Sequence, residues 1–207
     1  MGLINILLKD PLTFIIIAVP LLYSVILHEL AHGYVAWRFG DPTAKVMGRL
    51  SLNPLRHLDV VGTLMLFFVG FGWAKPVPVN FSYLRKGRTP LIMVSAAGII
   101  VNTLLAFTAL FILRSIESTS GSLTNQLFFF FAHINIILAA FNLIPIPPLD
   151  GSKILMGFLP VSLQYSFLKV EPYGFFIIIG LLFFGILDPV IHFLRSAIMA
   201  VIGIMLF

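Results

Sequence analysis

Long apolar runs separated by short polar stretches dominate the pattern of this chain. Three of them are long enough to cross a bilayer at roughly 20 residues per span: 12–37, 91–113 and 126–144. A final apolar pair, 173–187 and 190–207, is broken at Asp188 and Pro189. This pattern predicts an all-α polytopic membrane protein, a bundle of about five transmembrane helices with the first three as its core.

Two polar stretches between the first and second runs have the character of strands. Residues 45–52 alternate in polarity, and 73–79 can pair with them. Pro76 and Pro78 forbid a helix in the second stretch but suit an edge strand, because proline cannot donate to a ladder. We therefore predict a small membrane-associated β-hairpin or sheet.

Composition supports the membrane assignment. Of 207 residues, 59% are hydrophobic and 10% are charged, which excludes an ordinary soluble domain. No long polar stretch separates the apolar runs, so 1–207 is predicted to be a single integral-membrane domain. Cysteine is absent, which leaves His, Asp and Glu as candidate metal ligands.

The formal net charge of +5 is explained by topology. Eight of the thirteen Lys and Arg residues lie between Arg38 and Arg88, where Asp41 and Asp59 are the only acids. The positive-inside rule makes this region cytoplasmic. No nucleic-acid partner is expected, because these cations are not clustered on an aromatic or glycine-rich surface.

Three ionisable residues, His28, Glu29 and His32, lie within the first apolar run, where lipid disfavours charge. On a helix the two histidines are one turn apart on the same face and can bind one metal ion. Glu29 lies about 100° around that turn, within reach of a water at the metal but poorly oriented as a third ligand. The spacing predicts two metal ligands and a general base.

A helix break supplies a third candidate ligand. Three prolines within 145–148 stop the preceding helix, and Gly151 allows a turn that presents Asp150. An isolated Asp at this position would usually be a helix cap. Two membrane crossings separate Asp150 from the histidine motif, however, so Asp150 and the two histidines are expected on the same side of the membrane. A further crossing at 60–72 would place Asp150 and the histidines on opposite sides of the membrane. This apolar run has only about 13 residues and is too short to span, so we predict that it is a re-entrant or interfacial segment. Two imidazoles and one carboxylate leave one position of tetrahedral Zn²⁺ open.

Two motifs together resemble the site-2 protease family of intramembrane zinc metalloproteases, peptidase family M50. They are His28-Glu29-Leu30-Ala31-His32 and Asn142-x-x-Pro145-x-x-x-Leu149-Asp150-Gly151. Three further stretches are similar to the short form of the family, which has no appended domains: 48–54, 57–62 and 72–80. The family's Gly-Pro-x-x-Asn element matches in part, because Ile99 stands where proline is usual while Asn102 fits.

The resemblance implies a zinc metalloendopeptidase that cuts in or near transmembrane segments of membrane-protein substrates, in regulated intramembrane proteolysis. One Zn²⁺ ion would be held by His28, His32 and Asp150, with Glu29 as the base. Asn142 could hydrogen-bond the substrate, or instead satisfy carbonyls freed by Pro145. Asn102 is a second candidate for substrate positioning.

The expected partners are a lipid bilayer, a substrate with a transmembrane helix and, as a candidate, a regulatory membrane protein. The expected location is the cell membrane, with the active site toward the cytoplasm. Because a helical substrate must unwind before cleavage, we hypothesise that 73–80 pairs with it by strand addition.

Two other functions remain as alternatives. Buried His, Glu and Asp also mark the ion pathways of divalent-metal or proton transporters, but those usually contain internal repeats and paired broken helices. Only one proline-broken helix is evident here. A catalytically silent membrane scaffold is the second alternative, although such a relative would more plausibly have lost Glu29 or a ligand.

Overall fold

The computed structural model describes residues 3–70, 72–116 and 122–206, and all regular secondary structure in these ranges is helical. Within them, five helices are long and apolar enough to cross a membrane, as predicted. They are α2 (Pro11–Arg38), α5 (Arg88–Ser115), α6 (Leu123–Asn142), α8 (Val161–Phe183) and α9 (Asp188–Leu206). Shorter helices are α1 (Leu3–Lys9), α3 (Thr43–Val46), η1 (Pro54–Arg56), α4 (Val60–Phe68) and α7 (Asp150–Phe158).

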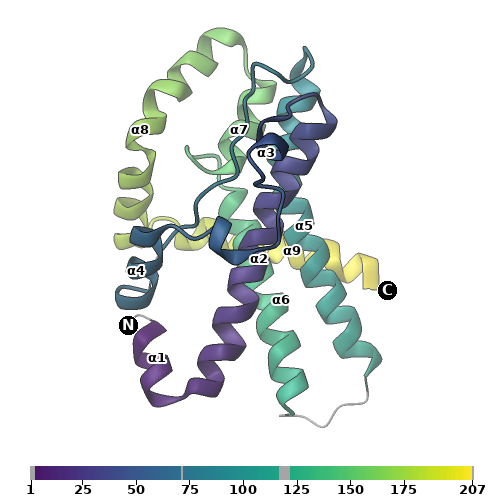
Figure 1. Ribbon diagram of the computed structural model, residues 1–207, viewed down its shortest axis with the longest axis vertical. Helices are drawn as coiled ribbons and strands as arrows, with labels where there is room; N and C mark the ends of the chain where they lie inside the picture. Colours follow the sequence, from purple (N-terminus) through teal and green to yellow (C-terminus); the bar gives the residue numbers. More distant parts are fainter. Residues whose placement is uncertain (1–2, 71, 117–121, 207) are drawn as a thin grey trace.

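Helices α2, α5 and α6 run side by side and form the predicted three-helix core (Figure 1). Small residues allow them to approach closely, since no hydrophobic force draws helices together in lipid. The buried alanines of α5 and α6 include Ala97, Ala106, Ala132, Ala139 and Ala140. This close packing sets the geometry around which the site is built.

The predicted break after the third apolar run is confirmed. Helix α6 ends at Asn142, and α7 begins at Asp150 after a short loop. Asp150 is the first residue of α7, while Leu149 occupies the cap position, so Asp150 is not the helix cap. Gly151 has no positive φ; instead, a Cβ there would meet the Leu143 carbonyl at 2.2 Å. Its role is to let α7 lie against the end of α6, not to make a turn.

The predicted β-hairpin is wrong for the described residues. Part of 45–52 belongs to α3, and 73–79 is extended but joins no strand. The only pairing in the described ranges is an isolated antiparallel bridge between Leu58 and Ala74. We call residues 73–80 the strap. Its backbone groups are bonded largely by side chains from distant parts of the chain, so no neighbouring strand is needed.

Three of the strap's backbone donors are already used within the protein, and strand addition to the strap stays a prediction. Pro76 and Pro78 carry no N–H. The N–H groups of Lys75, Val77 and Asn80 donate, respectively, to the His57 carbonyl, the Glu29 carboxylate and the Asp41 carboxylate. A substrate strand that paired with these donors would have to displace contacts within the protein.

The segment predicted not to cross the membrane forms α4, which has nine residues and is too short to span. Asp59 caps it by accepting from the Gly62 N–H at 2.8 Å. Helix α4 packs near α1, and its Phe67 also meets Phe14 of α2 with ring centroids 5.9 Å apart. The re-entrant or interfacial location of α4 stays a prediction.

The last two helices differ from their predicted form. Helix α8 starts at Val161 and continues through Pro172, so the segment predicted at 173–187 begins too late. It stands apart from the three-helix core, whereas α9 crosses behind that core instead of running alongside it (Figure 1). Ile198 and Ile202 anchor α9 on the apolar cluster of α5 and α6.

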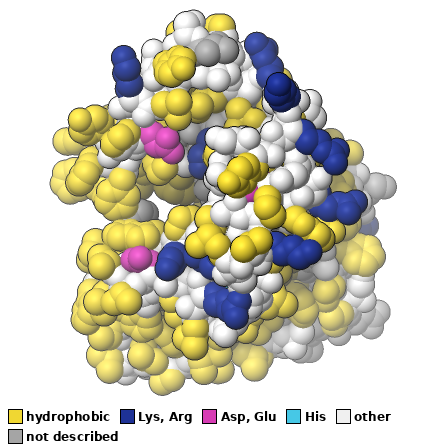
Figure 2. All heavy atoms as spheres, turned by 45° about the horizontal axis from the view of Figure 1, so that its top comes forward, with side chains coloured by type: hydrophobic (Ala, Val, Ile, Leu, Met, Phe, Trp, Pro, Cys, Tyr) yellow, Lys and Arg dark blue, Asp and Glu magenta, His cyan; other side chains and the backbone are white. Residues whose placement is uncertain are grey.

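Basic side chains are concentrated at one end of the molecule, and the cytoplasmic location of that end stays a prediction. Lys and Arg side chains gather over the end of the molecule where α2 ends and α5 begins, and few Asp or Glu side chains accompany them (Figure 2). The residues of the basic region between Arg38 and Arg88 connect these two helix ends.

Candidate metal centre

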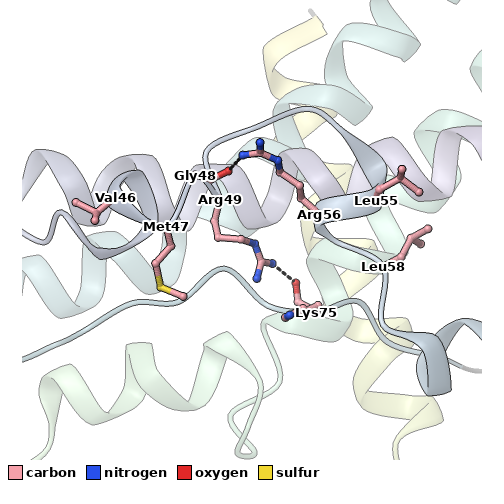
Figure 3. A pocket seen from close by; sticks show the side chains of 8 residues that line it. All are labelled: Val46, Met47, Gly48, Arg49, Leu55, Arg56, Leu58 and Lys75. Atoms are coloured by element: carbon pink, nitrogen blue, oxygen red, sulfur yellow. Dashed lines mark hydrogen bonds between the residues drawn. The ribbon is translucent and has the colours of Figure 1, made fainter.

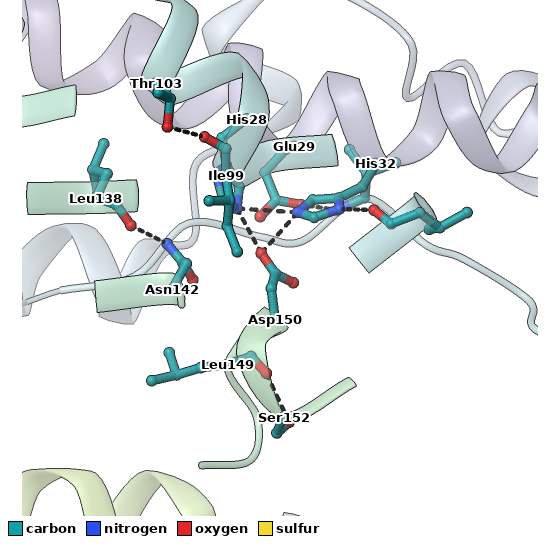
Figure 4. Close-up of polar contacts among 12 residues, drawn as sticks. His28, Glu29, His32, Ile99, Thr103, Leu138, Asn142, Leu149, Asp150 and Ser152 are labelled. Carbon is teal, nitrogen blue, oxygen red and sulfur yellow. Dashed lines mark hydrogen bonds and ion pairs between the residues drawn. The ribbon is translucent and has the colours of Figure 1, made fainter. Parts of the chain in front are cut away.

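Three donor atoms from two helices meet beside the core (Figure 4). The Nε2 atoms of His28 and His32 are 3.0 Å apart, as expected for histidines one turn apart on α2. Oδ2 of Asp150, on α7, lies 3.0 Å from each of them. The three residues are only 6%, 8% and 9% exposed, respectively. The structure therefore brings together the three predicted ligands in a group that could hold a metal ion.

This triangle fits zinc. Bonds of about 2.0 Å in a tetrahedron separate ligand atoms by about 3.3 Å, close to the observed spacing. Two nitrogens and one carboxylate oxygen are also a donor set found in catalytic zinc sites with one position left open. The pKa of Asp150 is raised by burial, but hydrogen bonds and charge interactions with both histidines outweigh this and lower it below the ordinary value. The carboxyl group is thus ionised at neutral pH, as a ligand must be.

Helix α5 orients both imidazoles. Nδ1 of His32 donates to the Val94 carbonyl at 2.7 Å, so Nε2 is the nitrogen that would bind a metal, releasing its proton as it does so. The His28 ring lies against Gly98, where a Cβ would come within 2.4 Å of a ring atom. Gly98 therefore contributes to the site because its missing side chain leaves space for the imidazole ring of His28.

Glu29 lies beside this group on the same turn of α2. Its Oε2 atom accepts a hydrogen bond from the Val77 N–H of the strap at 2.7 Å. Gly33, one turn later on that helix face, lets the Val77 side chain approach, because a Cβ there would meet Val77 Cγ1 at 2.7 Å. The strap is thus seated on the Glu29 face of α2.

A cavity of about 850 Å³ opens onto the centre. His28, Glu29, His32 and Asp150 line it together with the strap and parts of α5, α6, α7 and α8. Its wall is mostly apolar, and Trp73 of the strap meets Phe175 of α8 edge to face, with centroids 5.2 Å apart. The arrangement can hold an apolar stretch of chain against the metal ligands and a carboxylate.

The two asparagines predicted to position substrate lie in different surroundings. Asn142 lines the cavity, and its Nδ2 donates to the Leu138 carbonyl at 2.9 Å, one turn earlier in α6. Its bond is therefore within its helix and not to carbonyls near Pro145. Asn102 is fully buried and is not among the residues that line the cavity. Both roles stay predictions.

Sequence reasoning missed three contributors: Gly98, Gly33 and the Val77 N–H. The similarity of 72–80 to the family marked the strap as a segment of interest, but its two prolines were interpreted as those of an edge strand. Gly98 belongs to the partly matching Gly-Pro-x-x-Asn element, but nothing in that element predicted its contact with His28, and Gly33 carried no local signal.

Comparisons with known proteins agree with this geometry. The model of peptidase family M50 matches residues 112–185. "Putative zinc metalloprotease YwhC" of Bacillus subtilis is 41% identical over 172 residues, which cover 80% of this chain and 78% of that protein. This chain belongs to peptidase family M50. "Putative zinc metalloprotease Rip2" of Mycolicibacterium smegmatis is 29% identical over 174 residues, 82% of this chain and 67% of that protein. No solved structure matches.

Membership in M50 and the five candidate spans together make this protein a multi-pass membrane peptidase. The segment matched by the family model contains Asp150 and the cavity-lining part of α6. The histidine motif of α2 lies outside that segment, and the fold connects the two through the 3.0 Å contacts of the metal centre.

Proposed function

We propose that this M50 peptidase is a zinc endopeptidase that cuts transmembrane segments of other membrane proteins, in regulated intramembrane proteolysis. One observation carries the proposal: a buried two-histidine, one-carboxylate group lies beside Glu29 in a cavity among membrane helices. The names of the relatives support zinc as the metal.

His28, His32 and Asp150 would hold the ion. When bound, Zn²⁺ supplies a Lewis acid and lowers the pKa of a bound water toward about 7. The chain's own residues keep these ligands ready: the Val94 carbonyl fixes the tautomer of His32, and Gly98 sets the position of the His28 ring.

Glu29 acts as the general base. The Val77 N–H occupies Oε2, which leaves Oε1 to take a proton from the attacking water. Glu29 then returns this proton to the leaving amine as the peptide bond breaks. The second amide hydrogen of Asn142, on the cavity wall, can donate to the substrate carbonyl.

The cavity selects a short, unwound stretch of substrate. A helix with side chains is about 10–12 Å across, so a space of about 850 Å³ holds less than two turns. The apolar wall supports a transmembrane sequence as the substrate, and the exposed peptide bond would lie near Glu29. The basic end of the bundle supports a location in the cell membrane with the site toward the cytoplasm.

The test uses purified protein in liposomes with a model single-span substrate. Glu29→Gln should retain one zinc per chain but lose cleavage by at least about 100-fold, because general-base catalysis is removed. Asp150→Asn should lose both the zinc and cleavage. Asp188→Asn is the matched control, since Asp188 is likewise the first residue of a helix but lies in α9; it should behave as wild type.

Two outcomes would contradict the proposal. Cleavage by Glu29→Gln would remove Glu29 as the base. Zinc binding without cleavage by the wild type, across substrates with different spans, would instead support the scaffold alternative.

A further inference from the structure

One peptide group of the strap is held on both sides by distant side chains. Its N–H, from Val77, donates to Oε2 of Glu29 at 2.7 Å. Its carbonyl, from Pro76, accepts from Nη2 of Arg49 at 3.1 Å. The same nitrogen also donates to the Lys75 carbonyl at 2.8 Å (Figure 3). Because a peptide group is planar, the orientation of its carbonyl fixes the direction of its N–H.

The strap around this group has little freedom. Pro76 and Pro78 fix their own φ angles and favour extended backbone in the residue before each of them. Val77 is only 6% exposed and packs on Gly33 of α2. A contact at the Pro76 carbonyl can therefore fix the orientation of the Pro76–Val77 peptide plane. The Val77 N–H then has a fixed direction toward Glu29.

Among the described residues, Arg49 forms no ion pair with a carboxylate. It lines a second cavity, of about 450 Å³, whose wall includes Arg56 and Lys75 but no acidic residue. Arg49 is only 9% exposed, and its Nη2 donates to two strap carbonyls, those of Lys75 and Pro76. Arg56 donates to the Gly48 carbonyl and makes no hydrogen bond to the strap. Of the two guanidinium groups that line this cavity, only that of Arg49 hydrogen-bonds the Pro76–Val77 peptide group.

We propose that Arg49 is a positioning residue for the catalytic base and acts through the Pro76–Val77 peptide group; this rests on the proposed function. A cation at the carbonyl polarises the peptide and strengthens the N–H bond to the carboxylate. The bond holds Oε2 of Glu29 in place and thereby directs Oε1 toward the metal centre. Arg49 lies outside the cavity that receives substrate and contacts none of the three metal ligands.

The experiment compares Arg49→Gln, Arg49→Lys and the matched control Arg56→Gln in the liposome assay. Arg49→Gln should lower kcat by about 10–100-fold, as loss of a residue that orients a catalytic group commonly does. KM and zinc content should stay within about twofold of wild type, because the substitution alters neither the wall of the substrate cavity nor a metal ligand. Arg49→Lys should have a kcat between those of Arg49→Gln and wild type, because lysine keeps the positive charge but lacks the planar guanidinium group. Arg56→Gln should match wild type.

A double-mutant cycle tests the route. Val77→Pro removes the N–H while its two flanking prolines keep the backbone extended. If Arg49 acts through this peptide, Arg49→Gln should lower kcat by no more than about twofold in the Val77→Pro background. Independent, multiplicative losses would overturn the proposal.

The failure of this inference can be told from failure of the proposed function. If wild type cleaves and Glu29→Gln does not, but Arg49→Gln matches Arg56→Gln, then only the role of Arg49 is lost. Loss of zinc in Arg49→Gln would equally overturn it, because that would indicate a general structural defect.

Discussion

The two sides of the cavity are built on different physical principles. On one side, His28, His32 and Asp150 come from helices whose packing depends on small buried residues. On the other, the strap is extended and is held by polar contacts from Glu29, Asp41, Arg49 and His57. The helical side holds the three proposed metal ligands, whereas the strap holds the Glu29 carboxylate through the Val77 N–H.

This difference separates metal binding from turnover. Helix backbones satisfy their own hydrogen bonds, so the ligand positions depend mainly on steric contact between helices. The strap backbone depends on individual side chains, and each of these can be changed without touching the ligands. The same kind of substitution should therefore have different effects on the two sides.

The largest effect is expected from Gly98→Ala on the helical side. The new methyl group would lie 2.4 Å from the His28 ring, so the ring must leave its position. Zinc affinity should fall by about 10–100-fold, and cleavage should fall with it. Metal titration of purified protein measures this, with Gly203→Ala as the control because nothing lies within 4 Å of a Cβ there. Unchanged affinity would show that α5 does not set the ligand geometry.

A smaller effect is expected from Gly33→Ala on the strap side. Its methyl group would meet the ends of the Val77 and Leu50 side chains at 2.7 and 2.8 Å, and these can shift at moderate cost. Displacement of Val77 weakens its bond to Glu29, so kcat should fall by about 5–10-fold. Zinc content should stay at the wild-type value. Loss of zinc together with turnover would remove the separation between the two sides.

The smallest effect is expected from Asp41→Ala at the far end of the strap. Asp41 is fully buried and accepts from the Asn80 N–H at 2.7 Å and the Thr43 N–H at 2.9 Å. Removing it leaves buried donors unpaired and should lower stability by about 1–3 kcal/mol. Because the contact lies three residues beyond Val77, kcat should fall only about 2–5-fold. Thermal unfolding and kinetics on one preparation measure both quantities; a loss of kcat as large as that of Arg49→Gln would contradict the local role given to Val77.

The sequence by itself determined the parts of this protein that depend on local periodicity and on the bilayer. Apolar run length predicted five spanning helices, the spacing of His28 and His32 predicted two ligands on one face, and the proline-rich break together with parity predicted that Asp150 joins them. The structure has the five helices and brings the three side chains together, because a helix forms its hydrogen bonds within one segment and a lipid environment excludes most alternatives. That these side chains bind a metal stays a prediction.

Only the tertiary structure decided the strap, Gly98 and the course of the last helices. Polarity alternation in 45–52 and the prolines of 73–79 indicated a hairpin, but the actual partners of the strap are side chains from α2 and from the stretch that follows it. The apolar run at 173–187 predicted a helix over those residues, yet α8 extends from Val161 through Pro172 to Phe183. An extended backbone takes hydrogen bonds from any nearby donor or acceptor, and a glycine is needed only where another element approaches. The hydrogen bonds of an extended segment and the need for a glycine therefore both depend on contacts between distant residues, which no local sequence pattern predicts.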